Sequence, residues 1–101
     1  EEFNQSTKVL YFHLGEKESR SAFKHMQKLR SNGISCELFY EPVKMEKQFK
    51  YATRKNIPYA VIIGSNELTQ KTCIVKNLIK SEQQIIPADD LTLHFKTIMR
   101  S

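Results

Sequence analysis

Glycine and tryptophan are scarce in this sequence of 101 residues, which contains three glycines and no tryptophan. So few glycines argue against a glycine-rich phosphate loop, and neither G-x-G-x-x-G nor G-x-x-x-x-G-K-[ST] occurs. No apolar run approaches the roughly 20 residues that a membrane-spanning helix needs. We therefore expect no nucleotide-binding loop of these kinds and no membrane partner.

Cysteine is also rare, since Cys36 and Cys73 are the only two and form no C-x-x-C pair. This spacing disfavours a redox motif or a zinc knuckle, and two buried, reduced thiols suit a cytoplasmic protein. The histidines show no metal-ligand spacing: they are His13, His25 and His94. No local Ser-His-Asp or Cys-His arrangement occurs, so we expect no catalytic residue and no metal site.

The composition is that of one folded domain, with 40% hydrophobic and 27% charged residues. Lys and Arg number 16 against 11 Asp and Glu, so the formal net charge is +5, which favours an anionic partner. The chain begins with Glu1 and shows no signal-peptide pattern. We expect a fragment of a longer protein, with residues 1–7 flexible and residues 8–101 forming a single domain.

The order of the expected elements is β-α-β-α-β followed by β-β-α. Apolar or alternating runs predict the strands, with a polar hairpin at 80–83 between the last two. Apolar residues at helical spacing predict the buried stripes of the three helices, which are Ala22, Phe23, Met26 and Leu29, then Met45, Phe49 and Ala52, and last Leu91, Phe95, Ile98 and Met99. The strands are expected at 8–13, 34–40, 59–63, 71–78 and 84–86, and the helices at 17–32, at 44–55 and from 87–90 onward.

Two successive strand–helix–strand units predict parallel pairing with right-handed crossovers. The most apolar strands, 8–13 and 59–63, should be central, and the alternating strand 34–40 should lie at the edge. The sequence thus predicts a three-layer α/β fold. Its mixed five-stranded sheet has parallel strands in the order 2-1-3, extended by two further strands. Three helices pack on the sheet, with the first two on opposite faces.

A crevice is expected at the carboxyl ends of the strands. The loops expected to border it are 13–16, 40–43 and 64–67.

The second helix carries a basic face opposite its apolar one. Glu46 is its only acidic residue, and Gln48 falls at the border between the faces. An ordinary solvated face mixes Lys with Glu, whereas an unneutralised basic stripe with an aromatic ring suits a phosphate backbone with splayed bases. The basic face comprises Lys44, Lys47, Lys50, Tyr51, Arg54 and Lys55.

Stacking and base reading require different side chains. Tyr40 or Tyr51 could stack on a base, which is sequence-tolerant. Gln48, Glu67 and Lys76 could form hydrogen bonds with base edges, and each would equally suit a surface position where it only contacts water.

Several segments resemble a known family. They are the run 44–52, the run 56–64 with Glu67, and the shorter matches 75–78 and 82–83. Together they resemble the anticodon-binding domain of class II aminoacyl-tRNA synthetases, with the histidyl-tRNA synthetases as the nearest members. The likeness begins near Lys8 and covers nearly the whole remaining chain.

The resemblance implies a domain that docks the anticodon stem-loop of tRNA(His) and is not an enzyme by itself. It implies no cofactor in this domain. The parent would be a cytoplasmic, homodimeric histidine–tRNA ligase whose absent N-terminal domain uses ATP with Mg; the oligomeric state of the fragment stays open.

The resemblance places Lys44, Lys47 and Gln48 at a helix start, and Glu67, Lys76 and Gln83 on or near the RNA side. With the two tyrosines, the candidate RNA-binding residues are Tyr40, Lys44, Lys47, Gln48, Tyr51, Glu67, Lys76 and Gln83.

The sequence departs from the family in having Glu46, Lys71 and Ser81 where members often have glycine at or near the position.

A second interpretation of the sequence is a synthetase-like interaction or regulatory module, such as an uncharged-tRNA sensor, a regulatory paralogue from histidine biosynthesis or a dimerisation domain. A third, a small α/β enzyme using the crevice, lacks paired carboxylates and an activated nucleophile.

Overall fold

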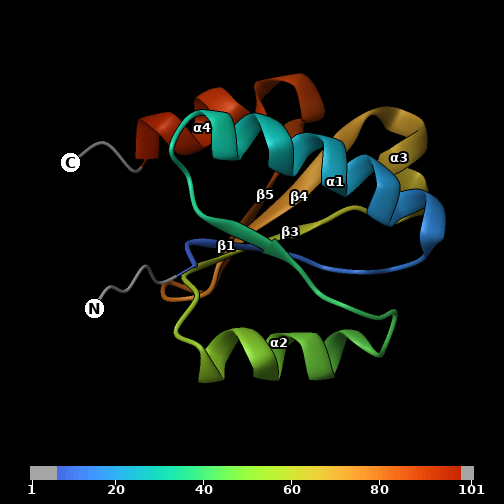
Figure 1. The fold of residues 1–101 in the computed structure, drawn as a ribbon, viewed down its shortest axis with the longest axis vertical. Helices are drawn as coiled ribbons and strands as arrows, with labels where there is room; N and C mark the ends of the chain where they lie inside the picture. Colours follow the sequence, from blue (N-terminus) through green and yellow to red (C-terminus); the bar gives the residue numbers. More distant parts are fainter. Residues whose placement is uncertain (1–6, 99–101) are drawn as a thin grey trace.

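A five-stranded sheet in the order β2-β1-β3-β4-β5 separates two helical layers (Figure 1). The computed structural model describes residues 7–98. The strands are β1 (Val9–Tyr11), β2 (Cys36–Leu38), β3 (Tyr59–Ile62), β4 (Thr72–Asn77) and β5 (Glu82–Pro87). The helices are α1 (Glu16–Ser31), α2 (Met45–Arg54), α3 (Ser65–Gln70) and α4 (Leu91–Ile98), the last preceded by a 3-10 turn at Ala88–Asp90.

The strand pairing confirms the order expected from the sequence. Strand β1 is parallel to both neighbours, so Val9 lies opposite Cys36 on one side and Tyr59 on the other. Strands β4 and β5 extend the sheet as antiparallel neighbours of β3. Strands β1 and β3 are central and covered by helices on both faces, which explains why both are continuous apolar runs.

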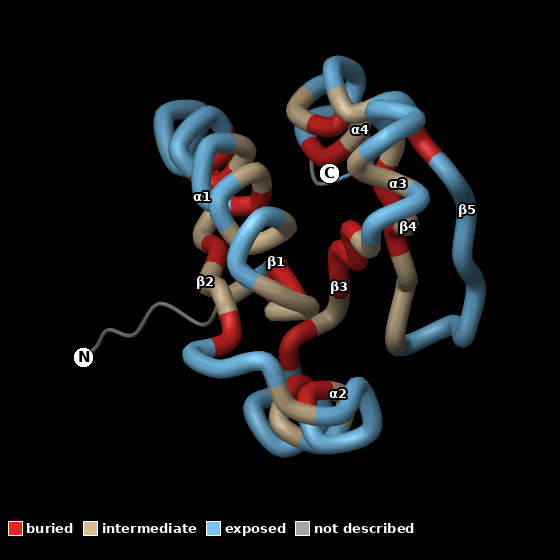
Figure 2. Tube along the Cα trace, turned by 90° about the vertical axis from the view of Figure 1, so that its right-hand side faces the viewer, coloured by how far each residue is buried: buried red, intermediate tan, exposed pale blue. Residues whose placement is uncertain are grey.

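The two faces of the sheet bury separate apolar clusters. Helices α1, α3 and α4 cover one face, and α2 alone covers the other (Figure 1). Figure 2 shows β1 and β3 buried between the layers, whereas β5 is exposed along most of its length. The cluster beneath α2 consists of Leu10, Phe12, Phe39, Ala52, Ile57, Ala60 and Ile62.

Two local expectations were wrong. The segment after β3 is not only a turn but the helix α3, which raises the number of α-helices from three to four. The carboxylate of Glu67 accepts a hydrogen bond from the N–H of Gly64 (2.8 Å), which caps the first turn, and Lys71 ends the helix in a left-handed conformation. Glu82 and Gln83 lie in β5 rather than in the hairpin turn.

Some expectations concern residues outside the described part of the chain. Met99, assigned to the buried stripe of the last helix, lies outside it, as does all but Thr7 of the segment expected to be flexible. Phe23, expected on the buried face of the first helix, is 48% exposed. No helix within residues 7–98 combines the length and apolarity needed to cross a membrane.

Gly33 ends α1 with a positive φ of 79°. No heavy atom lies within 4 Å of the position that a Cβ would occupy, so only the backbone conformation disfavours a side chain. We expect Gly33→Ala to lower the free energy of unfolding by about 1 kcal/mol. Gly33→Asn should cost less, because asparagine tolerates the left-handed region better. Urea unfolding of the three proteins tests this, and an equal loss in both variants would contradict it.

Candidate nucleic-acid interface

Helix α2 lies alone across one face of the sheet, so its outer surface and both flanks are open. It begins at the edge where the parallel strands β1, β2 and β3 end, and runs back across β1 and β3 (Figure 1). Ala52 is buried against the strands, and Phe49 and Tyr51 pack at the margin of this cluster. Apolar residues on one side of the helix thus fix which side carries the charges.

Gln48 anchors the start of α2 and, within residues 7–98, is the only fully buried polar residue. Its side-chain oxygen accepts a hydrogen bond from the N–H of His13 (2.8 Å). Its side-chain nitrogen donates to the carbonyls of His13 and Val43, both at 2.9 Å. The amide is therefore fully engaged within the protein, and Gln48 does not present a free edge to a base.

The same hydrogen bonds alter the expected crevice. Gln48 joins the loop after β1 to the loop before α2, two of the three loops expected to border an opening. Glu67, on the third loop, is engaged with the N–H of Gly64. The surface of α2, which the sequence already indicated, therefore remains the candidate site.

The flank of α2 nearest β2 gathers cations and aromatic rings around a shallow hollow of about 370 Å³. Tyr40 is 77% exposed, and its ring centroid lies 4.9 Å from that of buried Phe39. An exposed ring that is supported from beneath is a suitable platform for a base. We call this group the basic-aromatic flank; it comprises Tyr40, Lys47, Lys50, Tyr51 and Arg54 above Phe39.

Tyr51 is held in place by an acid on the neighbouring strand. Its hydroxyl donates to the carboxylate of Glu37 at 2.7 Å, and this hydrogen bond raises the pKa of the Tyr51 phenol. The ring also packs edge-to-face on Phe39, with centroids 5.3 Å apart. The Lys55 ammonium lies 5.9 Å from the Tyr51 ring centroid. Tyr51 therefore supports the flank rather than extending freely from it.

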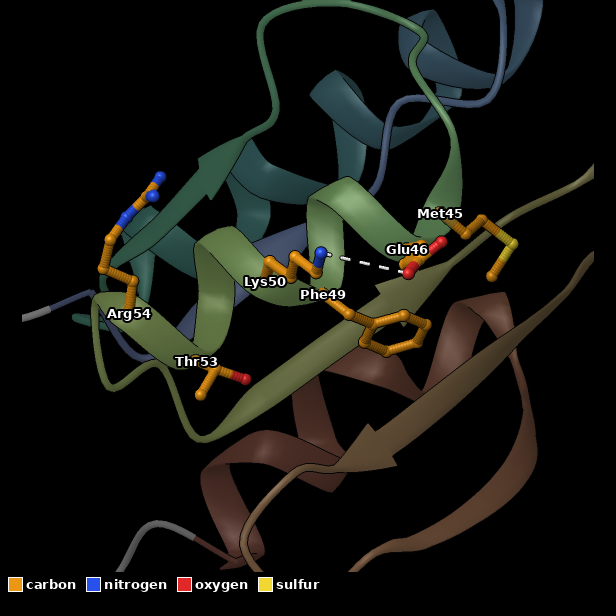
Figure 3. Close-up of a pocket in the computed structure, with 6 residues that line it drawn as sticks. All are labelled: Met45, Glu46, Phe49, Lys50, Thr53 and Arg54. Carbon is orange, nitrogen blue, oxygen red and sulfur yellow. Dashed lines mark ion pairs between the residues drawn. The ribbon is translucent and has the colours of Figure 1, made fainter.

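The charges of α2 are only slightly neutralised. Lys50 pairs with Glu46 at 3.9 Å between two largely exposed side chains, as the dashed line in Figure 3 shows. Such exposed pairs contribute little. Among residues 7–98, the ion pairs are this one and Arg20–Glu16, so Lys47 and Arg54 have no acidic partner there.

The opposite flank of α2 is more apolar. Figure 3 shows Phe49 directed toward the strands, with Met45 and Thr53 on either side of it along the helix. The Lys76 ammonium on β4 lies 4.8 Å from the Phe49 ring centroid. Gln83 on β5 is the register partner of Lys76. This flank adds an aromatic face and a cation to the α2 surface, whereas Gln83 on the edge strand also lines a hollow with His94 and Ile98 of α4.

The structure thus divides the eight candidate residues. Tyr40, Lys47 and Tyr51 lie together on the basic-aromatic flank, and exposed Lys44 immediately precedes α2. Lys76 belongs to the opposite flank, and Gln83 lies beside it on the edge strand β5. Gln48 is buried, and Glu67 lies on α3 in the other helical layer.

Sequence reasoning missed two contributors to this surface. Phe49 was assigned only to the apolar face of its helix, yet it is partly exposed and lies against Lys76. Glu37 was read as one polar residue of an alternating strand, and its bond to Tyr51 spans 14 positions. No local pattern reports either contact.

Comparison with known proteins shows the family of this chain. The anticodon binding domain family matches residues 8–97, so the chain belongs to that family. Among its relatives, the histidine–tRNA ligase of Porphyromonas gingivalis is 39% identical over 87 residues, which are 86% of this chain and 19% of that protein. The histidine–tRNA ligase of Bacillus licheniformis is 40% identical over 84 residues, covering 83% of this chain and 20% of that protein.

Solved structures show the same fold. A histidyl-tRNA synthetase from Nostoc sp. PCC 7120 superimposes with a TM-score of 0.88 at 25% identity, covering 94% of this chain and 23% of that one. The RNA binding domain of a threonyl-tRNA synthetase from Cryptosporidium parvum matches with a TM-score of 0.82 at 19% identity, covering 91% of this chain and 23% of that one. This chain spans about a fifth of the length of the curated relatives that it matches.

We expect Gln48→Ala to destabilise the fold by about 3 kcal/mol, because it leaves a cavity in place of a buried side chain and removes the partner of three part-buried backbone groups of His13 and Val43. Gln48→Glu should be severe at pH 7, since a carboxylate would face two carbonyl oxygens. Burial raises the folded-state pKa of such a carboxyl, so this variant should gain stability relative to wild type as the pH falls from 7 to 5.

Denaturant unfolding at both pH values measures these effects. Lys47→Ala, one position earlier and exposed, is the matched control and should change stability by less than about 0.5 kcal/mol. A Gln48→Ala protein as stable as this control would show that the three hydrogen bonds contribute nothing.

Proposed function

We propose that this chain binds the anticodon loop of a tRNA that accepts histidine, with the surface of α2 as its contact face. The observation that carries the proposal is the basic-aromatic flank, where exposed Tyr40 lies among Lys47, Lys50 and Arg54. The match to the anticodon binding domain family and the likeness to histidine–tRNA ligases support it.

The two flanks of α2 suit different parts of an RNA loop. On the β2 side, the cations meet phosphates while an unstacked base lies on Tyr40, a contact worth about 1–3 kcal/mol. On the β4 side, Lys76 and Gln83 provide donors and an acceptor for base edges. The first flank supplies affinity and the second supplies discrimination between loops.

The proposal extends to a longer protein. In a histidine–tRNA ligase, this domain would hold the tRNA while a catalytic domain, using ATP with Mg, esterifies the distant acceptor end. Holding the tRNA raises its effective concentration at that catalytic domain. A cytoplasmic homodimer is the form we propose for that protein. No cofactor has a role in the proposed contacts of this chain.

Charge reversal at Lys47 should weaken the binding of a tRNA(His) anticodon hairpin by about fivefold at low salt. The slope of log K against log salt should become less steep by about 0.7, the value for one phosphate contact with single-stranded RNA. Glu46→Gln should strengthen binding, because it removes the carboxylate beside Lys50. Fluorescence anisotropy titrations at several salt concentrations measure both.

Lys96→Glu is the matched control, because it makes the same charge change at an exposed position of α4, in the other helical layer. Equal losses for Lys47→Glu and Lys96→Glu would mean that only net charge matters. No binding to the hairpin, or equal binding to a hairpin with a scrambled anticodon, would contradict anticodon recognition. A complete lack of hairpin binding would favour the alternative function, a synthetase-like interaction or regulatory module.

Tyr40→Ala should reduce hairpin affinity about tenfold, because it removes a stacking surface, whereas Tyr40→Phe should bind almost as wild type. Both variants should retain wild-type stability, since the ring is 77% exposed. Anisotropy titration combined with thermal unfolding tests this. Equal losses in the two variants would assign the effect to the hydroxyl and exclude stacking.

A further inference from the structure

Helix α1 carries a second row of cations, on the layer opposite α2. Lys17, Arg20, Lys24 and Lys28 are all exposed. At 100° per residue they fall within an arc of about 80°. The buried residues of α1, which are Ala22, Met26 and Leu29, lie on the other side of the helix. The α1 row therefore points away from the sheet, and Figure 2 shows the outer turns of α1 exposed.

Acidic residues scarcely interrupt the α1 row. From Arg20 to Ser31 the sequence contains no Asp or Glu. Glu16 pairs with Arg20 at 3.4 Å, but both side chains are largely exposed. Within the described chain, no carboxylate forms an ion pair with Lys17, Lys24 or Lys28.

Two further features border the α1 row. Asp89 from the turn before α4 lies beside Ser21 and His25, on one side of the row. Phe23 is 48% exposed on the other side, so an aromatic ring borders the cations. Besides Glu16 at its start, the row thus has Asp89 at one margin, and it has an apolar ring at the other margin, where a solvated helix would carry polar residues.

The spacing of the α1 row suits a regular polyanion. One cation appears at each turn, about 5–6 Å from the next. Protein partners deplete lysine at their interfaces, whereas surfaces that bind nucleic acids are strongly positive and polar. We propose that the α1 row contacts the sugar-phosphate backbone of the base-paired stem that adjoins the anticodon loop. This inference rests on the proposed function, since it assumes that an RNA hairpin is the ligand.

The topology brings the starts of both basic helices to one edge of the molecule. Helices α1 and α2 both begin where the parallel strands end, and lie on opposite sides of the sheet (Figure 1). Lys17 in the first turn of α1 and Lys44 before α2 thus lie near the same edge. A hairpin held there places its loop along α2 and its stem along α1.

Two RNAs distinguish binding at the α1 row from binding at α2. One is the tRNA(His) anticodon hairpin, and the other is a linear strand that contains only the loop nucleotides. Lys17→Gln/Lys24→Gln, which removes the cation at the shared edge and one two turns along, should bind the hairpin about tenfold more weakly at low salt. Its salt slope should become less steep by about 1.8, or 0.9 for each phosphate of a duplex. Binding of the linear strand should be unchanged. Lys47→Glu should weaken both RNAs, and Lys96→Gln should alter neither.

The outcomes distinguish the two proposals. If the α1 double variant binds the hairpin as wild type does, or weakens both RNAs equally, the stem contact is overturned. If Lys47→Glu has no effect while the α1 double variant does, the α2 site is overturned and the α1 contact stands. Thermal unfolding should show all variants folded, because every substituted lysine is exposed.

Discussion

The amide of Gln48 holds the end of β1 and the start of α2 in one fixed relation. Three hydrogen bonds at 2.8–2.9 Å occupy both ends of the side chain, and the residue is inaccessible to solvent. Without them, the part-buried backbone groups of His13 and the carbonyl of Val43 would lose their partner, which is costly. The position of α2, and with it the orientation of Tyr40 and Lys47, depends on this contact. A buried residue thus determines how the exposed residues meet a ligand.

The distribution of charge follows from how the layers are covered. Three helices share one face of the sheet, whereas α2 covers the other alone. The isolated helix keeps both flanks open and can present cations on one and an aromatic face on the other. On the crowded face, only α1 directs a long row of cations outward. The net charge of +5 is therefore concentrated on two helices that begin at the same edge, and is not spread evenly.

Much of the fold was predictable because its signals are local. The apolar runs of β1 and β3 and the alternation in β2 gave the strand order, and the amphipathic patterns of α1 and α2 gave the helices that cross between the strands. Helix α3 was missed because six residues with few apolar side chains carry no periodic signal, and its cap depends on the bond from Gly64 to Glu67. Phe23 was grouped with Ala22, Met26 and Leu29, yet at 100° per residue it lies at least about 60° around the helix from each of them and stays exposed.

By itself the sequence determined that a basic, amphipathic helix follows an edge strand and that no metal or nucleotide motif accompanies it, because composition and periodicity are properties of neighbouring residues. Only the tertiary structure decided which of the polar residues remain available. Gln48 is buried by contacts 35 positions away, Tyr51 is tied to Glu37 on another strand, and Tyr40 is left exposed above Phe39. These distinctions arise from hydrogen bonds and packing between segments distant in sequence, whose geometry no local pattern contains.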